Sequence, residues 1–284
     1  MTLPLRNLVL VVVVATLAVT AGCNSVGSGQ ATETPAANAT PTATDTATPT
    51  DGPETPESAL NGSELHDETA SAVEDAGSYT STVDAVVVVN ATSGESEITT
   101  NTTTQVDFDA GVGLRERAQT TASSTLDQTI RTDVYTDGNT SYRRQNSSRG
   151  VTYDNQTGTP EGLGSFRPVN VTSYDQSTYA LANLTDAFVW EENGTETVDG
   201  TTTTRYTITG VANAAPIVGQ SEANITASSG SVYVDSDGAV RRVTLAYTLE
   251  NEQAQATSTT ELTFTLTDFG STTVEEPDWL DQAR

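Results

Sequence analysis

The feature that most limits the fold of this chain is a series of long segments in which apolar and polar side chains alternate. In residues 98–108, apolar or methyl-bearing side chains occupy every second position, and Thr, Asn, Gln and Asp stand between them. A period of two places successive side chains on opposite faces of a β-strand, with one face covered and one in water. Strands are predicted at residues 79–89, 98–108, 129–135, 140–145, 201–209, 231–234, 240–249 and 260–267.

Turn sequences between these segments indicate antiparallel pairing. Asp-Gly and Asn-Gly pairs favour tight hairpin turns because their residues adopt positive φ with little strain. Such turns are predicted at residues 137–139, 193–194, 199–200 and 235–238. The uninterrupted Val run at residues 86–89 predicts a strand covered on both faces, where a helix lies across it.

One amphipathic helix is predicted between Ser63 and Gly77. Ser63 opens it, Glu64 follows in the first turn, and Gly77 ends it. Its covered face is formed by Leu65, Thr69, Ala72, Val73 and Ala76. We expect this helix to pack on the sheet. A second helical segment is predicted within residues 176–186, and residues 211–223 are interpreted as an insertion with helical character.

The N-terminus has the layout of a signal peptide. Arg6 precedes an apolar-to-neutral run at residues 8–19, and small residues follow before Cys23. The run is too short to span a bilayer core of about 30 Å, which requires about 20 residues. A signal peptide is therefore predicted at residues 1–22, and the protein is expected to be exported to the outer face of the cytoplasmic membrane.

Cys23 is the only cysteine of the chain, so an intramolecular disulfide is excluded. Its position after Ala21 and Gly22 resembles the lipobox of bacterial and archaeal lipoproteins, although that motif usually has Leu where Thr20 stands. We therefore expect Cys23 to carry a lipid that anchors the protein to the membrane. An uncleaved N-terminal anchor and an incidental cysteine are the alternatives.

Residues 24–60 consist mainly of Thr, Ala, Pro, Ser and Glu, with almost no large apolar side chain. Such a segment cannot bury a core and is expected to be a disordered stalk. At about 3.1 Å per residue it reaches roughly 100 Å when fully extended. The predicted organisation is a signal peptide at 1–22, a lipidated Cys and stalk at 23–60, and one domain at 61–284.

The charge balance of the chain is strongly acidic. The formal net charge is −26, and all twelve basic residues are Arg. An acidic surface keeps a protein solvated where molar salt screens charge over about 3 Å, so the balance predicts a high-salt habitat, with a specific cation-binding role as the alternative. The sequence shows no basic stripe that could neutralise phosphates, which argues against a nucleic-acid partner.

The order of stalk, helix and long strands beginning at Tyr79 resembles the half-barrel of LolA/LolB-like lipoprotein carriers and of mycobacterial lipid-carrying lipoproteins. The Val-Tyr-Val-Asp hairpin at residues 232–238 and the ending at residues 269–280 share this resemblance, which covers residues 61–284. The whole resembles an uncharacterised haloarchaeal lipoprotein family. The resemblance implies a mainly β fold with a few helices, in which a strongly curved antiparallel sheet forms an unclosed half-barrel over helices. A β-sandwich is the alternative fold.

Asn-x-Ser/Thr sequons are frequent, at eleven of the fifteen Asn residues. Such sequons accept N-linked glycans in exported proteins, whereas a Thr-rich composition without modification is the alternative explanation. The candidate N-glycosylation sites are Asn38, Asn61, Asn90, Asn101, Asn139, Asn146, Asn155, Asn170, Asn183, Asn193 and Asn224.

The apolar positions of the alternating segments provide candidates for the lining of a ligand cavity. Ordinary core packing is the alternative explanation for all of them, since a sequence does not reveal a void. These candidates are Val83, Val87, Ile98, Val106, Phe108, Tyr206, Ile208, Val232, Val234, Leu245, Tyr247, Phe264 and Leu266.

The sequence has no motif for catalysis or metal binding. His66 is the only His, and no G-x-S-x-G segment provides a nucleophile elbow. One His and one lipid-committed Cys do not supply the usual ligands of zinc. Residues 235–238 begin like a calcium loop, but Ala246 stands where its bidentate Glu is required, so a tight turn is predicted. We expect a protein that is not an enzyme and has neither cofactor nor metal.

Two functions remain open. The first is a non-enzymatic cell-surface lipoprotein that binds or carries a lipid, a lipidated protein or another apolar ligand on the concave face of the sheet. The second is a structural or adhesive glycosylated envelope protein. Sequons on all exposed faces favour the second function, whereas an apolar mouth without sequons favours the first.

Overall fold

The computed structural model describes residues 59–158, 170–172, 178–180, 185–218 and 223–284. Contacts divide the chain into two units, Met1–Pro56 and Glu57–Arg284, and the second unit contains all of the described residues. The predicted signal peptide, Cys23 and residues 24–58 of the predicted stalk lie outside the described part.

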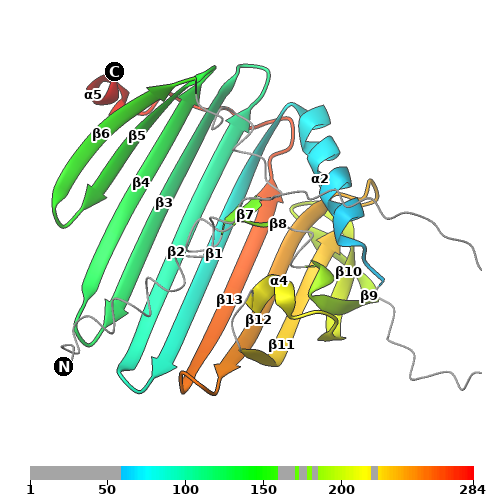
Figure 1. The fold of residues 1–284 in the computed structure, drawn as a ribbon. Coiled ribbons are helices and arrows are strands. Elements are labelled where there is room, and N and C mark those ends of the chain that lie inside the picture. Colours follow the sequence, from blue (N-terminus) through cyan, green and yellow to red (C-terminus); the bar gives the residue numbers. More distant parts are fainter. Residues whose placement is uncertain (1–58, 159–169, 173–177, 181–184, 219–222) are drawn as a thin grey trace, which may run out of the picture. The chain divides into compact units, whose positions relative to one another are not determined.

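One antiparallel sheet of eleven strands dominates the second unit (Figure 1). The strand order is β6-β5-β4-β3-β2-β1-β13-β12-β11-β10-β9, which makes β6 and β9 the edges. Its strands are β1 (Ser78–Ala91), β2 (Gly94–Asp107), β3 (Val112–Ser123), β4 (Asp127–Asp137), β5 (Thr140–Ser147), β6 (Gly150–Thr157), β9 (Phe188–Val198), β10 (Thr201–Val211), β11 (Asn224–Val234), β12 (Val240–Asn251) and β13 (Ala256–Thr267). A separate two-stranded sheet pairs β7 (Asn170–Thr172) with β8 (Thr178–Ala180).

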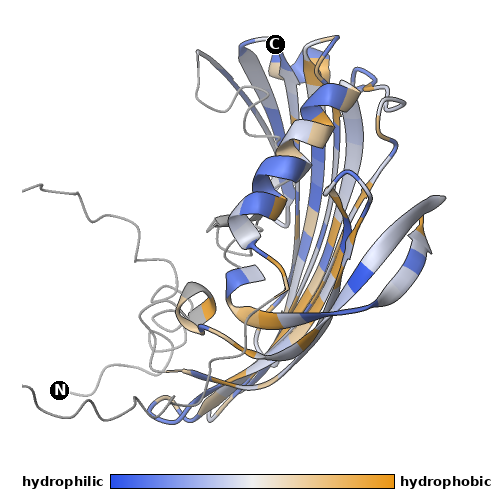
Figure 2. Ribbon diagram, turned by 90° about the vertical axis from the view of Figure 1, so that its right-hand side faces the viewer, coloured by the Kyte–Doolittle hydropathy of each residue, from blue (hydrophilic) through white to orange (hydrophobic). Residues whose placement is uncertain are grey.

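The large sheet is strongly bent, and its edges do not meet (Figure 2). Helix α2 (Gly62–Ala76) lies on its hollow side. The short helices α4 (Ala215–Val218) and α5 (Leu280–Ala283) complete the described helices that Figure 1 labels. The predicted unclosed half-barrel is therefore confirmed, and the observed fold is not the alternative β-sandwich. Within the described ranges, no helix combines the length and apolar character needed to cross a membrane.

All eight predicted strand segments coincide with strands of the large sheet, but β3, β6 and β9 of that sheet were not predicted, nor were β7 and β8 of the small sheet. β3 alternates Arg with Glu, β6 is exposed along its whole length, and β9 is rich in Glu, so none shows the apolar alternation on which the prediction relied. The helix predicted within residues 176–186 is wrong at Thr178–Ala180, which form β8, whereas residues 185–186 are helical. Residues 176–177 and 181–184 lie outside the described part. The insertion at 211–223 contains a helix as predicted, α4.

The turn predicted at residues 193–194 is wrong, because both residues lie inside β9. The register between β9 and β10 shifts there, so Asn193 and Gly194 form a β-bulge opposite Arg205. Gly194 has a φ of +77°, which bulges and hairpin turns both require, and this shared requirement explains the error. The β9–β10 turn is formed by Asp199 and Gly200, as predicted.

The Val run of residues 86–89 is half-buried at every position. The prediction that this part of β1 is covered on both faces by a crossing helix is therefore wrong. Val is β-branched and packs well on a pleated surface, so the run reflects strand propensity and not complete burial.

Helix α2 begins at Gly62, one residue earlier than predicted. Asn61 caps it in place of Ser63, because Asn61 Oδ1 accepts hydrogen bonds from the backbone N–H groups of Ser63 and Glu64 at 3.0 and 3.3 Å. Gly77 ends the helix with a φ of +75°, as predicted.

The buried face of α2 packs on the sheet through Leu65, Thr69 and Val73. Thr69 also fixes the helix by hydrogen bonds. Its Oγ1 donates to the carbonyl of Leu65 at 2.6 Å and accepts from the backbone N–H of Val240, the first residue of β12, at 3.0 Å. These contacts hold α2 against the end of the sheet where β12 begins.

A second, smaller core lies away from α2. Trp279, Leu280 and Ala283 of the C-terminal segment pack with Tyr135 of β4, and Tyr142 of β5 borders them. The Arg144 guanidinium lies over the Trp279 ring at 5.4 Å. The C-terminal segment therefore covers part of the sheet.

We predict that Thr69→Val lowers the free energy of unfolding by about 1–3 kcal/mol, because the buried N–H of Val240 loses its acceptor while the side-chain volume is kept. Urea denaturation monitored by circular dichroism measures the change. Thr226→Val, at an exposed position of β11, is the matched control and should leave stability within about 0.5 kcal/mol. Equal stability of the two variants would contradict the role of Thr69.

Candidate functional site

The strand register defines two faces of the sheet. Directly paired residues of antiparallel strands project their side chains to the same face. Tyr79 of β1 belongs to the core cluster that includes Leu65 and Val73 of α2, so the face that carries Tyr79 is named the inner face. The opposite one is the outer face. Pairing continues without a shift from β1 to β6 on one side and from β1 to β12 on the other.

The thirteen candidate lining residues share the inner face. Six are buried in the core cluster, namely Val106, Val232, Val234, Leu245, Phe264 and Leu266. Five are partly buried against that cluster, namely Val83, Phe108, Tyr206, Ile208 and Tyr247. Val87 and Ile98 pair with each other in β1 and β2 and are half-buried. Packing therefore accounts for the first six, and the other seven carry the apolar surface that is not fully covered.

Acidic side chains of the central strands lie on one face only. In β1 to β5 and β11 to β13, the register places all ten Asp and Glu residues on the outer face and none on the inner face. The edge strands add Asp154 of β6 and Glu192 of β9 at inner positions. The ten outer residues are Asp84, Glu95, Glu97, Asp107, Glu116, Asp127, Asp133, Asp137, Glu250 and Glu261.

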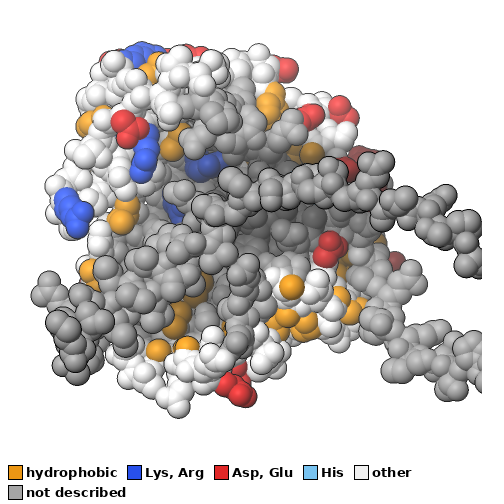
Figure 3. All heavy atoms as spheres, viewed as in Figure 1, with side chains coloured by type: hydrophobic (Ala, Val, Ile, Leu, Met, Phe, Trp, Pro, Cys, Tyr) orange, Lys and Arg blue, Asp and Glu red, His pale blue; other side chains and the backbone are white. Residues whose placement is uncertain are grey.

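Three Arg residues occupy inner positions of β3 and β5, and Figure 3 shows basic side chains on this face over β3–β6. Arg115 and Arg143 both pair with Val134, so they stand in one row two strands apart. Strand spacing puts their Cα atoms about 9.6 Å apart, and Arg117, two positions along β3, lies about 6.8 Å from Arg115. The inner face therefore has a basic part on β3 and β5 beside an apolar part on β1 and β11 to β13.

Tyr79 lies between these two parts. Its side chain is fully buried, and its hydroxyl has no hydrogen-bond partner among the described residues. Burial raises the pKa of the Tyr79 phenol, and the neighbouring Arg115 guanidinium lowers it to a smaller extent. The phenol is therefore neutral at physiological pH and keeps a proton to donate.

Sequence reasoning missed the basic part because β3 was not predicted as a strand. A usable signal was present in residues 113–121. The odd positions hold Gly, Arg, Arg, Gln and Thr, and the even positions hold Leu, Glu, Ala and Thr. This alternation has a period of two. It places basic and polar side chains at one set of positions and a mixture of apolar, acidic and polar side chains at the other. A search for apolar alternation does not detect it.

All eight described sequon asparagines are exposed. The register places five of them on the outer face, namely Asn90, Asn101, Asn146, Asn155 and Asn224. Asn193, in the β9 bulge, donates a side-chain hydrogen bond to Thr207 Oγ1, and Thr207 belongs to the outer face through its pairing with Ser231. Asn61 caps α2, and Asn139 lies in the β4–β5 turn. Asn38, Asn170 and Asn183 lack described side chains.

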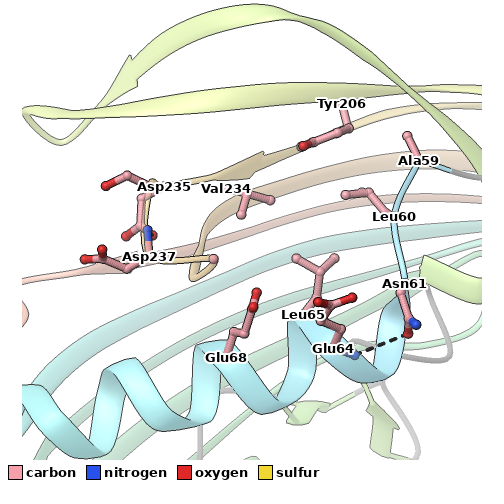
Figure 4. Close-up of a pocket in the computed structure, with 12 residues that line it drawn as sticks. Ala59, Leu60, Asn61, Glu64, Leu65, Glu68, Tyr206, Val234, Asp235 and Asp237 are labelled. Atoms are coloured by element: carbon pink, nitrogen blue, oxygen red, sulfur yellow. Dashed lines mark hydrogen bonds between the residues drawn. The ribbon is translucent and has the colours of Figure 1, made fainter.

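A pocket of about 390 Å³ lies between α2 and the turn from β11 to β12 (Figure 4). Its apolar lining includes Tyr206 and Val234, two of the predicted lining residues. Glu64, Glu68 and Asp237 also line it and give it a negative rim. This pocket is therefore poorly suited to an acidic or purely apolar ligand.

Asp235 in the same turn serves the fold. Its Oδ1 accepts the backbone N–H groups of Asp237 and Ala239, each at 3.0 Å, and its Oδ2 accepts Arg241 Nε at 2.6 Å. The tight turn predicted at residues 235–238 is therefore confirmed. The described residues contain no cluster of three or more side chains suited to hold a metal ion.

We predict that Asp235→Ala lowers the free energy of unfolding by about 2–4 kcal/mol, because it leaves two backbone donors and the largely buried Arg241 guanidinium without their acceptor. Thermal unfolding checks this value. Asp237→Ala, at an exposed neighbouring position, should change stability by less than about 0.5 kcal/mol. Stabilisation of the unmodified protein by added Ca²⁺ would contradict the assignment as a turn.

Comparison with known proteins identifies a family. The family model described as "Family of unknown function (DUF7537)" matches residues 8–283. No curated protein matches the chain. The family match does not establish a source, so the haloarchaeal resemblance stays a prediction.

Solved structures show a distant likeness. LprF from Mycobacterium bovis is 16% identical with a TM-score of 0.34, and the match covers 76% of this chain and 96% of LprF. Lipoprotein LppX from Mycobacterium tuberculosis is 15% identical with a TM-score of 0.28, covering 75% and 96%. A DUF1329 family protein from Desulfovibrio piger is 10% identical with a TM-score of 0.26, covering 78% and 97%. The mycobacterial part of the predicted resemblance recurs among these proteins.

Proposed function

The chain belongs to DUF7537, and we propose that it is a non-enzymatic, lipid-anchored surface protein that binds a lipid or another apolar ligand on the inner face of its sheet. The observation that carries this proposal is the segregation of side chains between the two faces. The inner positions of β1 to β5 and β11 to β13 hold no carboxylate and no sequon asparagine, although the chain has 38 acidic residues and eleven sequons.

Segregation of this kind suits contact with an apolar ligand. A carboxylate that loses water without gaining a partner costs several kcal/mol, so a face that receives acyl chains must exclude carboxylates. A glycan is bulky and hydrated, and it would obstruct the same face. The outer face carries the carboxylates of the central strands and the described strand sequons, and the C-terminal segment covers part of it.

The apolar surface that is available to a ligand is formed by inner-face residues that are not fully buried. Val83 and Val87 of β1, Ile98 of β2 and Tyr247 of β12 are half-buried there. The register joins them, since Val87 pairs with both Ile98 and Thr260, and Thr260 pairs with Tyr247. A strip across four strands results, in which Thr260 is the β13 member between apolar neighbours. An acyl chain lying on it would remove this apolar surface from water at about 25 cal/mol per Å².

The predicted anchor brings this face to its ligand. A lipid on Cys23 followed by the stalk of residues 24–60 would tether the domain to the membrane at a distance of up to roughly 100 Å. Tethering raises the local concentration of membrane lipids around the domain.

The sequon pattern separates the two functions left open by the sequence. A structural or adhesive envelope protein is expected to carry sequons on every exposed face, whereas the described strand sequons lie on the outer face only. Glycans on the outer face are compatible with ligand binding on the inner face. The binding function is therefore favoured, with glycosylation as an additional property.

We predict that Val87→Asn weakens binding of a pyrene-labelled diacyl lipid about 10-fold, because a buried amide without a partner costs about 1–2 kcal/mol. Pyrene fluorescence titration with delipidated protein measures the affinity. Val88→Asn is the matched control, since Val88 is the next residue of β1 and projects to the outer face. The proposal fails if the unmodified protein binds no lipid probe, or if the two variants bind it equally.

Intact mass spectrometry of membrane-extracted protein tests the anchor. We expect a mature chain that begins at Cys23 with an added lipid mass and with glycans, and a Cys23→Ser variant that lacks the lipid and is released from the membrane. Extraction with organic solvent should recover a co-purifying lipid from the inner face. A lipidated and glycosylated protein without bound lipid would instead support the structural function.

A further inference from the structure

The two edge strands of the large sheet, β6 and β9, differ in how they are protected (Figure 1). An open edge offers N–H and C=O groups to any other strand, and proteins block such edges with charges or bulges. β9 has both, since it carries three Glu residues and the bulge at Asn193 and Gly194. β6 pairs with β5 from Gly150 to Thr157 without a shift, and Asp154 is its one charged residue. β6 is therefore a flat and weakly guarded edge.

β6 also exposes apolar surface, and all eight of its residues are exposed. Val151 and Tyr153 are 47% and 37% exposed and stand two positions apart on the outer face. The pairing of Ser147 with Gly150 across a two-residue turn directs the backbone groups of the even-numbered residues of β6 toward β5. Those of Val151, Tyr153 and Asn155 therefore point to the free side, where no described strand pairs with them.

The charge of this edge favours a second copy of the same chain. The β5–β6 hairpin, residues 140–157, carries three Arg and one Asp, a formal charge of +2 in a chain of −26. The β9–β10 hairpin, residues 188–211, carries four acidic residues and one Arg, a formal charge of −3. Net charge opposes contact between two copies, and the opposition is smallest at an edge that does not add to it. Two copies can therefore meet at β6 more easily than at β9.

β6 is also complementary to itself. In antiparallel pairing about a two-fold axis, residues whose backbone groups point outward face each other. With Tyr153 on the axis, Tyr153 pairs with its own copy, Val151 with Asn155, and Thr152 with Asp154. Residues 150–156 of both strands are then paired, and the carboxylate of Asp154 faces a hydroxyl. A shift that placed Asp154 on the axis would oppose two carboxylates, so this register is preferred.

We propose that β6 is a docking edge for a second copy of this chain, so that two sheets join into one across a two-fold axis at Tyr153. The pairing covers Val151 and Tyr153 and places both inner faces on the same side of the joined sheet. A two-fold contact closes on itself, so assembly ends at the dimer. The predicted membrane anchor would raise the effective concentration of the two copies, so a weak contact suffices. This inference does not depend on the proposed lipid-binding function.

Cysteine cross-linking tests the contact and its register. The background is the full chain with Cys23→Ser, which lacks the only native thiol. Directly paired residues have Cα atoms about 5.5 Å apart, which suits a disulfide. We expect Tyr153→Cys to give a disulfide-linked dimer under mild oxidation. The matched control is Thr152→Cys, at the preceding exposed residue. Its Cα would lie about 8 Å from its counterpart, which is too far for a disulfide.

Sedimentation velocity over a concentration series measures reversible association in the same background. We expect a dimer with a Kd on the order of micromolar, which falls as salt screens the net charge. Tyr153→Lys opposes two like charges on the axis and should raise the Kd at least about 10-fold. Leu126→Lys adds the same charge at a side chain that is 47% exposed between β3 and β4, and it should leave the Kd unchanged. Circular dichroism checks that both variants keep the fold.

The outcomes that overturn the proposal are distinct. A monomer at every concentration overturns it. An equal effect of the two Lys variants does so as well, because the contact would then lie elsewhere. Cross-linking of Thr152→Cys as readily as Tyr153→Cys overturns the register, since random collision would explain both. Assemblies larger than a dimer overturn the two-fold contact, because they require a contact that does not close, such as β6 with β9 of the next copy. None of these results bears on lipid binding.

Discussion

The antiparallel pairing of β1 with β13 joins two separate meanders into one sheet. Every other ladder of the eleven-stranded sheet connects strands that follow each other in the sequence, within β1–β6 or within β9–β13. The register of this one junction decides which side chains of the two meanders share a face. A slip by one residue would place Asp84 and Glu261 among the apolar side chains. The segregation of acidic and apolar side chains across the whole sheet therefore depends on this pairing.

The sequence contained enough information for the fold class but not for the site. Long Thr- and Val-rich alternation predicted most strands, and Gly77 fixed the end of α2, because local chemistry determines both features. The strands β3, β6 and β9 lack apolar alternation and are held by their neighbours, so propensity could not identify them. The candidate lining residues came together on one face, yet the difference between the six buried ones and the half-buried ones depends on where α2 packs. Arg115 and Arg117 could not be placed without β3.

Acidic residues have two different uses in this protein. Most of those on the strands lie on the outer face, where water can hydrate them. A few serve the fold, such as Asp235, which holds the β11–β12 turn, and Asp133, which receives Arg144 at 2.6 Å. The net charge of the chain is −26, and the carboxylates of the central strands contribute to it from the outer face and not from the inner face.

The central position of β1 and β13 also has a consequence for folding. β1 lies near the beginning of the domain and β13 near its end, so their pairing closes a loop that contains all of the other described strands. Each meander can pair within itself through short hairpins, whereas the junction between them has high contact order and is expected to form late. For a chain that is synthesised from its N-terminus, the two halves of the apolar face are united only after the last strand has been made. Until that moment each half presents an unpaired strand edge, which is the state most exposed to misassembly and most in need of protection by other factors.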